Sequence, residues 1–328
     1  MSGSSALHKV FLKCPRIAVA MDAAVRTSIL MAIIFAVSQL GAIAMASSVL
    51  GTEVRLFENP DDPLVPLYYI AAVLLFTFAT LYIMKKRREN VVRYIFLGAV
   101  IYTVFFVLLV ILARVLNDLA GAVIALVATG LASYYLVKKP EWYVIDATGV
   151  LMSIGIIGIF GISLSILPVF VLLIALAIYD AVSVYGTKHM ITLADGVTKM
   201  KLPILLVVPK KRGYSYLTQK PLTEQLKEGD EREAMFMGLG DIIIPGVLAV
   251  SAFSFLPELS VGGVSGSLLV ALGSIAGALA GFAVLMTFVM KGKPQAGLPL
   301  LNGGAIIGYV LSYLAVYQDL SLGMTWLW

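Results

Sequence analysis

Residues 165–186 read SILPVFVLLIALAIYDAVSVYG, an apolar run in which Asp180 is the only charged side chain. A helix needs roughly 20 apolar residues to cross the hydrocarbon core of a bilayer, so this run predicts a transmembrane helix. A charged side chain inside such a helix is costly and therefore points to a function. The run decides the fold class because the chain repeats runs of this kind along its whole length.

These apolar runs dominate a chain of 328 residues that is 60% hydrophobic and 13% charged. A water-soluble domain of this length could not cover so much apolar surface with polar side chains. The expected fold is therefore all-α, a polytopic membrane protein of nine transmembrane helices, which we place at residues 27–50, 65–84, 92–114, 119–137, 142–161, 165–186, 234–256, 266–290 and 297–317.

Lysine and arginine residues set the expected orientation. If the N-terminus is cytoplasmic, 22 of the 24 lysine and arginine residues fall in inside segments, and only Arg55 and Arg114 face outward. Cytoplasmic loops carry an excess of basic residues, so this distribution predicts a cytoplasmic N-terminus and an outside C-terminus.

A single long connection divides the predicted helices into six plus three. An inverted-repeat transporter would be expected to show two matching halves, which this division does not offer. Met21 is an alternative start, which would make residues 1–20 partly a leader. The expected parts are a basic cytoplasmic arm at 1–26, helices one to six at 27–186, a cytoplasmic loop at 187–233, and helices seven to nine at 234–328.

No metal or other cofactor is expected. Cys14, His8 and His189 fall outside the apolar runs and offer neither a disulfide pair nor a zinc cluster. The net charge of +5 is dispersed between the helices rather than gathered with aromatic residues. The expected surroundings are therefore a lipid bilayer, with no nucleic acid.

Asp180 and Asp241 are the two acids that lie deep in predicted helices without a basic partner, whereas Arg114 and Asp146 sit near helix ends. Asp180 lies about six residues before the cytoplasmic end of the sixth helix, and Asp241 about seven after the cytoplasmic start of the seventh. At about 1.5 Å per residue, both sit roughly 10 Å below the cytoplasmic surface. The helices are consecutive and antiparallel, so the two acids can face each other.

Two carboxylates that meet in a low-dielectric site cannot both ionise cheaply, and they keep one shared proton near neutral pH. This is the arrangement of aspartic proteases. The ionised acid draws a proton from water, the water attacks the scissile carbonyl, and the protonated acid stabilises the oxyanion. The pair predicts an endopeptidase with Asp180 and Asp241 as catalytic residues. Structural hydrogen bonding between helices and a proton or cation path are the alternatives.

The neighbours of the two acids suit this chemistry. Gly238, placed one helical turn before Asp241, and Gly240 leave room for a partner helix or a substrate backbone. Pro245 cannot donate to the Asp241 carbonyl and so loosens the helix beside the acid. Tyr179 offers a hydroxyl that could orient the dyad or the substrate, with ordinary packing as the alternative.

Residues 203–209, PILLVVP, form a short apolar and partly β-branched run between prolines in the long loop. Lys210 to Gly213 suggest a turn, and Tyr214 to Leu217 a return strand. The expected hairpin adds a substrate strand to its edge through backbone hydrogen bonds, with Leu206 among the substrate-binding residues. A hydrophobic loop resting on the membrane surface is the alternative.

Three motifs together resemble the presenilin and signal peptide peptidase family. Its pattern is a YD pair in the sixth span, GxGD in the seventh and PAL at the start of the ninth. Here these motifs correspond to Tyr179-Asp180, Gly238-Leu239-Gly240-Asp241 and Ala296-Gly297-Leu298-Pro299. The third motif departs from the family, because Ala296 stands where it has Pro and Gly297 where it has Ala.

The resemblance implies an intramembrane aspartyl protease in which Ala296, Gly297, Leu298 and Pro299 shape the substrate site. Its orientation resembles that of presenilin, which implies single-span substrates running from N-outside to C-inside. A chain this short looks like a prokaryotic member, located in the cell membrane, that acts without obligatory protein subunits.

Three other functions use the same features. A prepilin-peptidase-like enzyme also carries a GxGD acid, but would usually place its pair on other spans. A proton-coupled transporter or channel could use the two carboxylates as a relay. A structural or chaperone-like membrane protein is the third.

Overall fold

A computed structural model describes residues 4–50, 56–57, 59–86, 89–187, 205–211, 213–216, 234–290 and 295–324. Each predicted apolar run contains a helix. Before the long loop these are α1 (Ser4–Val49), α2 (Val65–Lys85), α3 (Glu89–Ala113), α4 (Asp118–Lys138), α5 (Trp142–Ser163) and α6 (Ile166–Val182), which continues into a π-helical turn, η1 (Ser183–Thr187). After the loop follow α9 (Leu239–Phe255), α10 (Gly266–Met290) and α11 (Gly297–Tyr317).

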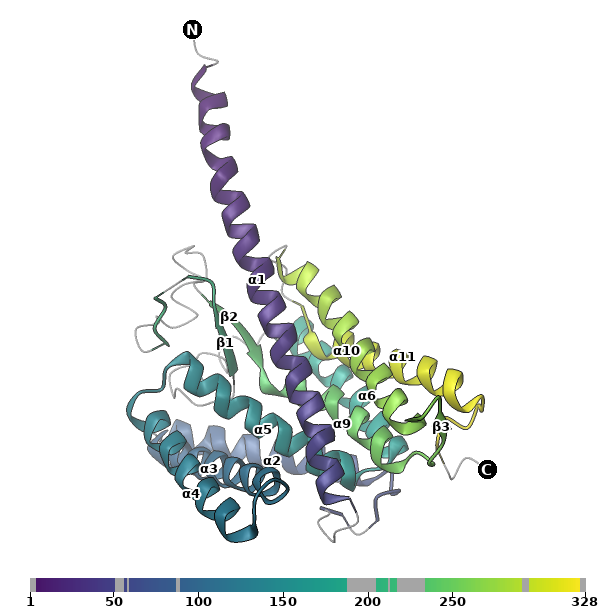
Figure 1. Ribbon diagram of the computed structural model, residues 1–328. Helices are drawn as coiled ribbons and strands as arrows, with labels where there is room; N and C mark the ends of the chain where they lie inside the picture. Colours follow the sequence, from purple (N-terminus) through teal and green to yellow (C-terminus); the bar gives the residue numbers. More distant parts are fainter. Residues whose placement is uncertain are drawn as a thin grey trace.

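In the described residues, seven helices are long and apolar enough to cross a membrane, whereas α9 and the apolar part of α2, Val65–Thr80, are shorter. The all-α membrane fold is thereby confirmed in outline, and the count of nine spans stays a prediction. The start of α1 and the end of α11 point to opposite ends of the bundle (Figure 1). The predicted orientation, with a cytoplasmic N-terminus and an outside C-terminus, requires that arrangement.

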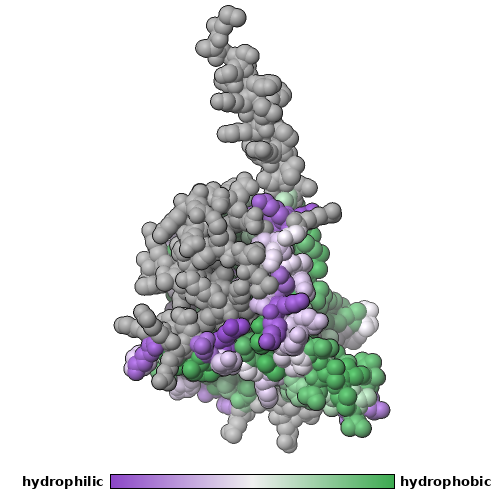
Figure 2. Space-filling view, turned by 90° about the vertical axis from the view of Figure 1, so that its left-hand side faces the viewer, coloured by the Kyte–Doolittle hydropathy of each residue, from purple (hydrophilic) through white to green (hydrophobic). Residues whose placement is uncertain are grey.

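The interior of the bundle is formed by α5 and α9. Helix α5 packs against α1, α3 and α9, and α9 also touches α6, α10 and α11. Small residues allow the close approach: a side chain at Gly161 of α5 would collide with Val250 of α9. The outer helices instead present large apolar side chains, such as Leu75, Tyr102 and Leu311, to the outside. On the face in Figure 2, hydrophobic residues gather in the lower part, below a group of hydrophilic ones.

Helices α10 and α11 lie side by side (Figure 1) and meet backbone to backbone. A Cβ added to Gly277 would collide with the carbonyl of Gly304, and one added to Gly281 with the carbonyl of Leu300. The row Gly273, Gly277 and Gly281 therefore packs one helix against another, as the four-residue spacing indicates.

Two strands interrupt the helical pattern. Strand β1 (Leu205–Pro209) confirms the strand expected in the PILLVVP run, of which Pro203 and Ile204 lie outside the described residues. Its partner is β2 (Ala234–Gly238), antiparallel, with Val207 opposite Phe236. A second, shorter hairpin, β3 (Ser260–Val261) and β4 (Val264–Ser265), joins α9 to α10.

The predicted return strand at Tyr214 to Leu217 is therefore wrong: residues 214–216 form no strand, and Leu217 lies outside the described residues. The predicted start of the seventh helix at residue 234 is wrong as well, because α9 begins at Leu239. The apolar run Ala234–Gly238 is continuous with the run of α9, so hydropathy alone could not separate the strand from the helix.

Candidate active site

Asp180 lies near the C-terminal end of α6, with a side chain that is only 6% exposed. Its Oδ2 accepts a hydrogen bond from the backbone amide of Leu298 at 3.0 Å. The amide of Gly297 also interacts favourably with this carboxylate. Asp180 is thus held by the first residues of α11, a segment more than a hundred residues away in the sequence.

The start of α11 explains this contact. A helix leaves its first backbone N–H groups without partners and carries a partial positive charge at that end. The N-cap residue, Ala296, has no side chain that could accept from them. Pro299 has no N–H to satisfy and fits the first turn. Asp180 therefore supplies, from another helix, the acceptor that α11 lacks.

Asp241 occupies the third position of α9 rather than the middle of a long helix, and its side chain is half-buried. Gly238, predicted to lie one helical turn earlier, is instead the extended N-cap residue at the end of β2. The Gly238 amide interacts with the Asp241 carboxylate, and a Cβ at Gly238 would lie 3.4 Å from Asp241 Oδ2. The acid thus sits where a strand turns into a helix.

Gly297 joins the two acids. The carboxylates of Asp180 and Asp241 interact electrostatically with each other. A Cβ at Gly297 would lie 3.4 Å from Asp241 Oδ1, while the amides of Gly297 and Leu298 face Asp180. The structure therefore brings together both acids, Gly238 and the Ala296–Pro299 segment, although these come from α6, α9 and α11.

Two predicted supporting residues lie apart from this cluster. Tyr179 is 52% exposed, and within the described residues no hydrogen bond joins it to either acid. Gly240 is exposed, and a Cβ there would meet nothing within 4 Å. Gly240 thus leaves open space beside Asp241, and the orienting role of Tyr179 stays a prediction.

A different tyrosine reaches the site. The backbone amide of Ala296 donates to the hydroxyl of Tyr185 at 3.4 Å. Tyr185 belongs to η1, the π-helical turn that follows α6. Hydropathy does not indicate this turn, since a π turn leaves no distinct hydropathy pattern.

Two buried amides brace the helices that carry the acids. Gln39 of α1 donates from Nε2 to the carbonyl of Ile242 at 3.5 Å. Ile242 lies three residues before Pro245, which interrupts the hydrogen bonding of α9. Asn302 of α11 donates from Nδ2 to the carbonyl of Leu173 in α6 at 2.9 Å. Both side chains are fully buried, and in the part of the chain that the structure describes their amide oxygens have no partner. The backbones of α6 and α9 are thereby tied to helices that carry neither acid.

Asp146 was expected near a helix end, and it lies in the second turn of α5 (Trp142–Ser163). Its side chain is 7% exposed, and its Oδ1 accepts from the backbone amide of Val207 at 2.7 Å. A third carboxylate is therefore buried beside the strands that lead to Asp241.

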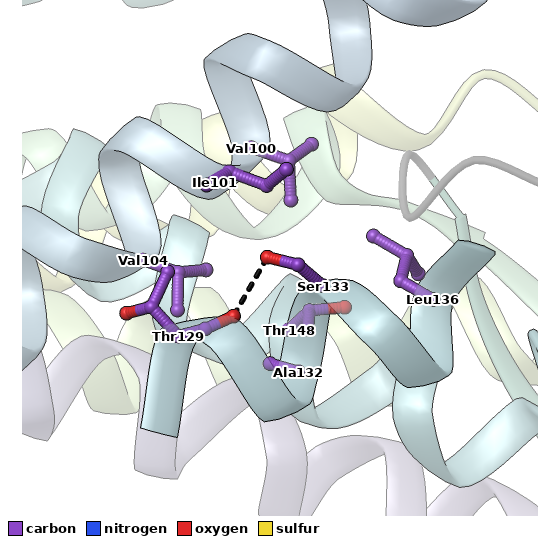
Figure 3. A pocket seen from close by; sticks show the side chains of 8 residues that line it. All are labelled: Val100, Ile101, Val104, Thr129, Ala132, Ser133, Leu136 and Thr148. Carbon is purple, nitrogen blue, oxygen red and sulfur yellow. Dashed lines mark hydrogen bonds between the residues drawn. The ribbon is translucent and has the colours of Figure 1, made fainter. Parts of the chain in front are cut away.

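The small cavity in Figure 3 lies elsewhere, between α3, α4 and α5. Its volume is about 10 Å³, about the minimum for one water molecule, so it is too small for a peptide. Within α4, the Ser133 hydroxyl donates to the Thr129 carbonyl at 2.6 Å, while the Thr129 hydroxyl has no partner among the described residues. Among the described residues, no group of three His, Cys, Asp or Glu side chains could hold a metal ion.

Comparisons with known proteins agree on one family. The profile of signal-peptide peptidase, presenilin aspartyl protease matches residues 31–317. The chain is similar to a presenilin family intramembrane aspartate protease solved in space group C222, with 34% identity, a TM-score of 0.64, and coverage of 88% of this chain and 99% of that chain. A structure described in the same words, in space group P2, has 33% identity, a TM-score of 0.61, and coverage of 87% and 96%. No curated protein sequence matches.

Proposed function

The chain belongs to the signal-peptide peptidase and presenilin family of aspartyl proteases, and from this premise we propose that Asp180 and Asp241 together hydrolyse peptide bonds within transmembrane helices. The protein is an intramembrane aspartyl protease and a multi-pass integral membrane protein. The observation that carries the proposal is that the start of α11 lies against both acids: the Leu298 amide binds Asp180, and a Cβ at Gly297 would lie 3.4 Å from Asp241 Oδ1. This arrangement supports a single site that contains the two acids.

The proposed chemistry divides the work between the two acids. The ionised carboxylate takes a proton from a water molecule, which attacks the scissile carbonyl, and the protonated carboxyl donates to the developing oxyanion. Asp241 lies next to the open space at Gly240, whereas the Asp180 carboxylate is bound by the start of α11. A substrate backbone therefore reaches the dyad from the side of α9.

A transmembrane substrate must be unwound before its carbonyls can be attacked. Strands β1 and β2 offer an edge for the extended segment. The Val207 amide donates to Asp146 and so cannot also donate to β2, which makes Val207 and Phe236 a non-hydrogen-bonded pair. The backbone N–H and C=O of Phe236 then point away from β1. A substrate strand added to this edge of β2 runs toward Asp241, which follows Gly238 by three positions.

The same proposal includes the expected topology and partners. Nine spans with a cytoplasmic N-terminus place β1, β2 and the dyad toward the cytoplasmic side. Substrates are then single-span proteins that run from N-outside to C-inside. The chain is proposed to act in the bilayer without obligatory protein subunits.

Purified protein in liposomes, incubated with a single-span substrate, tests the proposal. Asp180→Asn and Asp241→Asn should each lower the cleavage rate by at least roughly a hundredfold, because each removes half of the acid–base pair. Asp118→Asn is the matched control, since Asp118 is an exposed acid at the start of α4. Thermal unfolding of each variant verifies that it is folded.

Near-normal cleavage by either dyad variant contradicts the two-carboxylate mechanism. Solute flux that Asp180→Asn abolishes, with no proteolysis by the wild-type protein, would favour the transporter alternative instead. Peptide mimics with a hydroxyl in place of the attacked carbonyl should inhibit cleavage, because they resemble the transition state that both acids stabilise.

A further inference from the structure

The carboxylate of Asp146 lies outside the dyad, yet it is buried to the same degree as Asp180. It stands in the second turn of α5, and the amide that it binds, that of Val207, is the middle one of β1. A carboxylate that accepts a backbone N–H in a buried place forms one of the stronger hydrogen bonds in proteins. Asp146 therefore fixes β1 to α5 at a single, defined residue.

The direction of this bond divides the amides of β1 into two sets. Those of Leu206 and Val208 face β2, because their neighbour Val207 belongs to a non-hydrogen-bonded pair. The Val207 amide points the other way, where an added strand would otherwise bind it. The Asp146 carboxylate occupies the place of such an added strand, so a substrate cannot pair with the outer edge of β1. The outer edge of β2 is then the edge at which a substrate strand can be added.

The surrounding face of α5 supports both the strand and the catalytic helix. A Cβ at Gly149, one turn after Asp146, would lie 3.2 Å from Leu206 of β1 and 3.3 Å from Leu239, the first residue of α9. At the N-cap of α5, five residues before Asp146, the Glu141 carboxylate accepts from the Ser215 hydroxyl at 2.8 Å and from the Tyr216 amide at 3.2 Å. Helix α5 thus contacts β1, the segment that follows β1 and the start of α9.

We propose that Asp146 is a positioning residue for proteolysis: by binding the Val207 amide it fixes β1 on α5, and β2, paired to β1, then holds the substrate strand at one register relative to Asp241. Asp146 takes no part in the acid–base chemistry. The inference rests on the proposed function, since a register has meaning only if a strand is cleaved.

The test compares Asp146→Ala with Asp146→Asn, using a single-span substrate in liposomes and mass spectrometry of the products. The alanine variant loses the acceptor, so cleavage should spread to neighbouring bonds and KM should rise roughly tenfold, the size of one such hydrogen bond. The asparagine variant keeps an acceptor oxygen and should cut at the wild-type position. A merely structural role would lower the yield with the folded fraction and leave the cleavage position unchanged.

Val207→Pro removes the same hydrogen bond from the other side without touching Asp146, and it keeps the inference testable if the alanine variant does not fold. The double variant should cut as each single one does, because both changes remove one bond. Additive effects, an unchanged cleavage position in Asp146→Ala or Val207→Pro, or an asparagine variant as impaired as the alanine variant would each overturn the inference. If the wild-type protein does not cleave at all, the proposed function itself fails, and the two failures are thereby distinguished.

Discussion

The backbone amide of Leu298 donates to Oδ2 of Asp180 at 3.0 Å, so a helix that begins after the long loop is capped by an acid from a helix that ends before it. This contact ties the geometry of the dyad to the placement of α11. A change at the start of α11 should therefore alter proteolysis without any change to the acids.

Substitution of Gly297 tests this dependence. Gly297→Ala would place a methyl group 3.4 Å from Asp241 Oδ1, an ordinary contact, so we expect cleavage within a few-fold of wild type. Gly297→Leu would put a large side chain on the carboxylate, and kcat should fall by roughly a hundredfold or more, because displacement of the reacting groups by about 1 Å is that costly. Initial rates with a single-span substrate measure both. Equal activity of the two variants would show that this residue does not face the reacting groups.

The pH dependence of kcat should be bell-shaped. Below the optimum both carboxyls hold protons and no base is left, whereas above it both are ionised and no acid is left. Burial raises the pKa of Tyr216 to about 12. Its phenol therefore stays protonated over the pH range of the measurement and does not contribute to the pH dependence of kcat. A rate that is flat from about pH 4 to 9, when chemistry is rate-limiting, would rule out a shared proton.

The pairing of β1 with β2 can be broken by Leu206→Pro. This change removes an amide that faces β2 opposite Met237 and leaves both the dyad and the Asp146 contact in place. We expect KM to rise and the cleaved bond to shift, which product analysis by mass spectrometry measures. If the variant cleaves at the wild-type position with unchanged KM, strand addition is wrong and the loop is only a linker.

The glycine contact between α10 and α11 predicts a stability effect. Gly277→Val should lower the free energy of unfolding by about 1–3 kcal/mol, because its side chain would meet the backbone of Gly304 and Gly308. Gly130→Ala is the matched control: nothing lies within 4 Å of a Cβ there, and the change should stabilise the helix by roughly 0.5–1 kcal/mol. Thermal unfolding in detergent measures both, and equal shifts would contradict the predicted backbone contact.

The sequence predicts the helices and the two acids because both depend on local signals. Each helix of the bundle is an apolar run, and Asp180 and Asp241 are conspicuous as charges inside such runs. The position of Asp241 is less accurate. Ala234–Gly238 is as apolar as the helix that follows, and only pairing with Leu205–Pro209 makes it a strand.

Contacts between distant segments are the part that the sequence could not provide. Asp146 looks like an acid near a helix end until the structure places Val207 against it, 61 residues away. Tyr179 lies beside Asp180 in the sequence, yet Tyr185 is the tyrosine that reaches Ala296. In both cases the partner is chosen by packing in three dimensions, which neither hydropathy nor spacing records.

The backbone contact between α10 and α11 also bears on catalysis. Side chains between helices can change rotamer and let the helices slide, but glycine rows leave nothing to rearrange. The two helices therefore behave as one rigid unit. The start of α11 in this unit presents the amides of Gly297 and Leu298 to the acids. The dyad is preorganised by an element with little freedom to yield when an unwound substrate pulls on it.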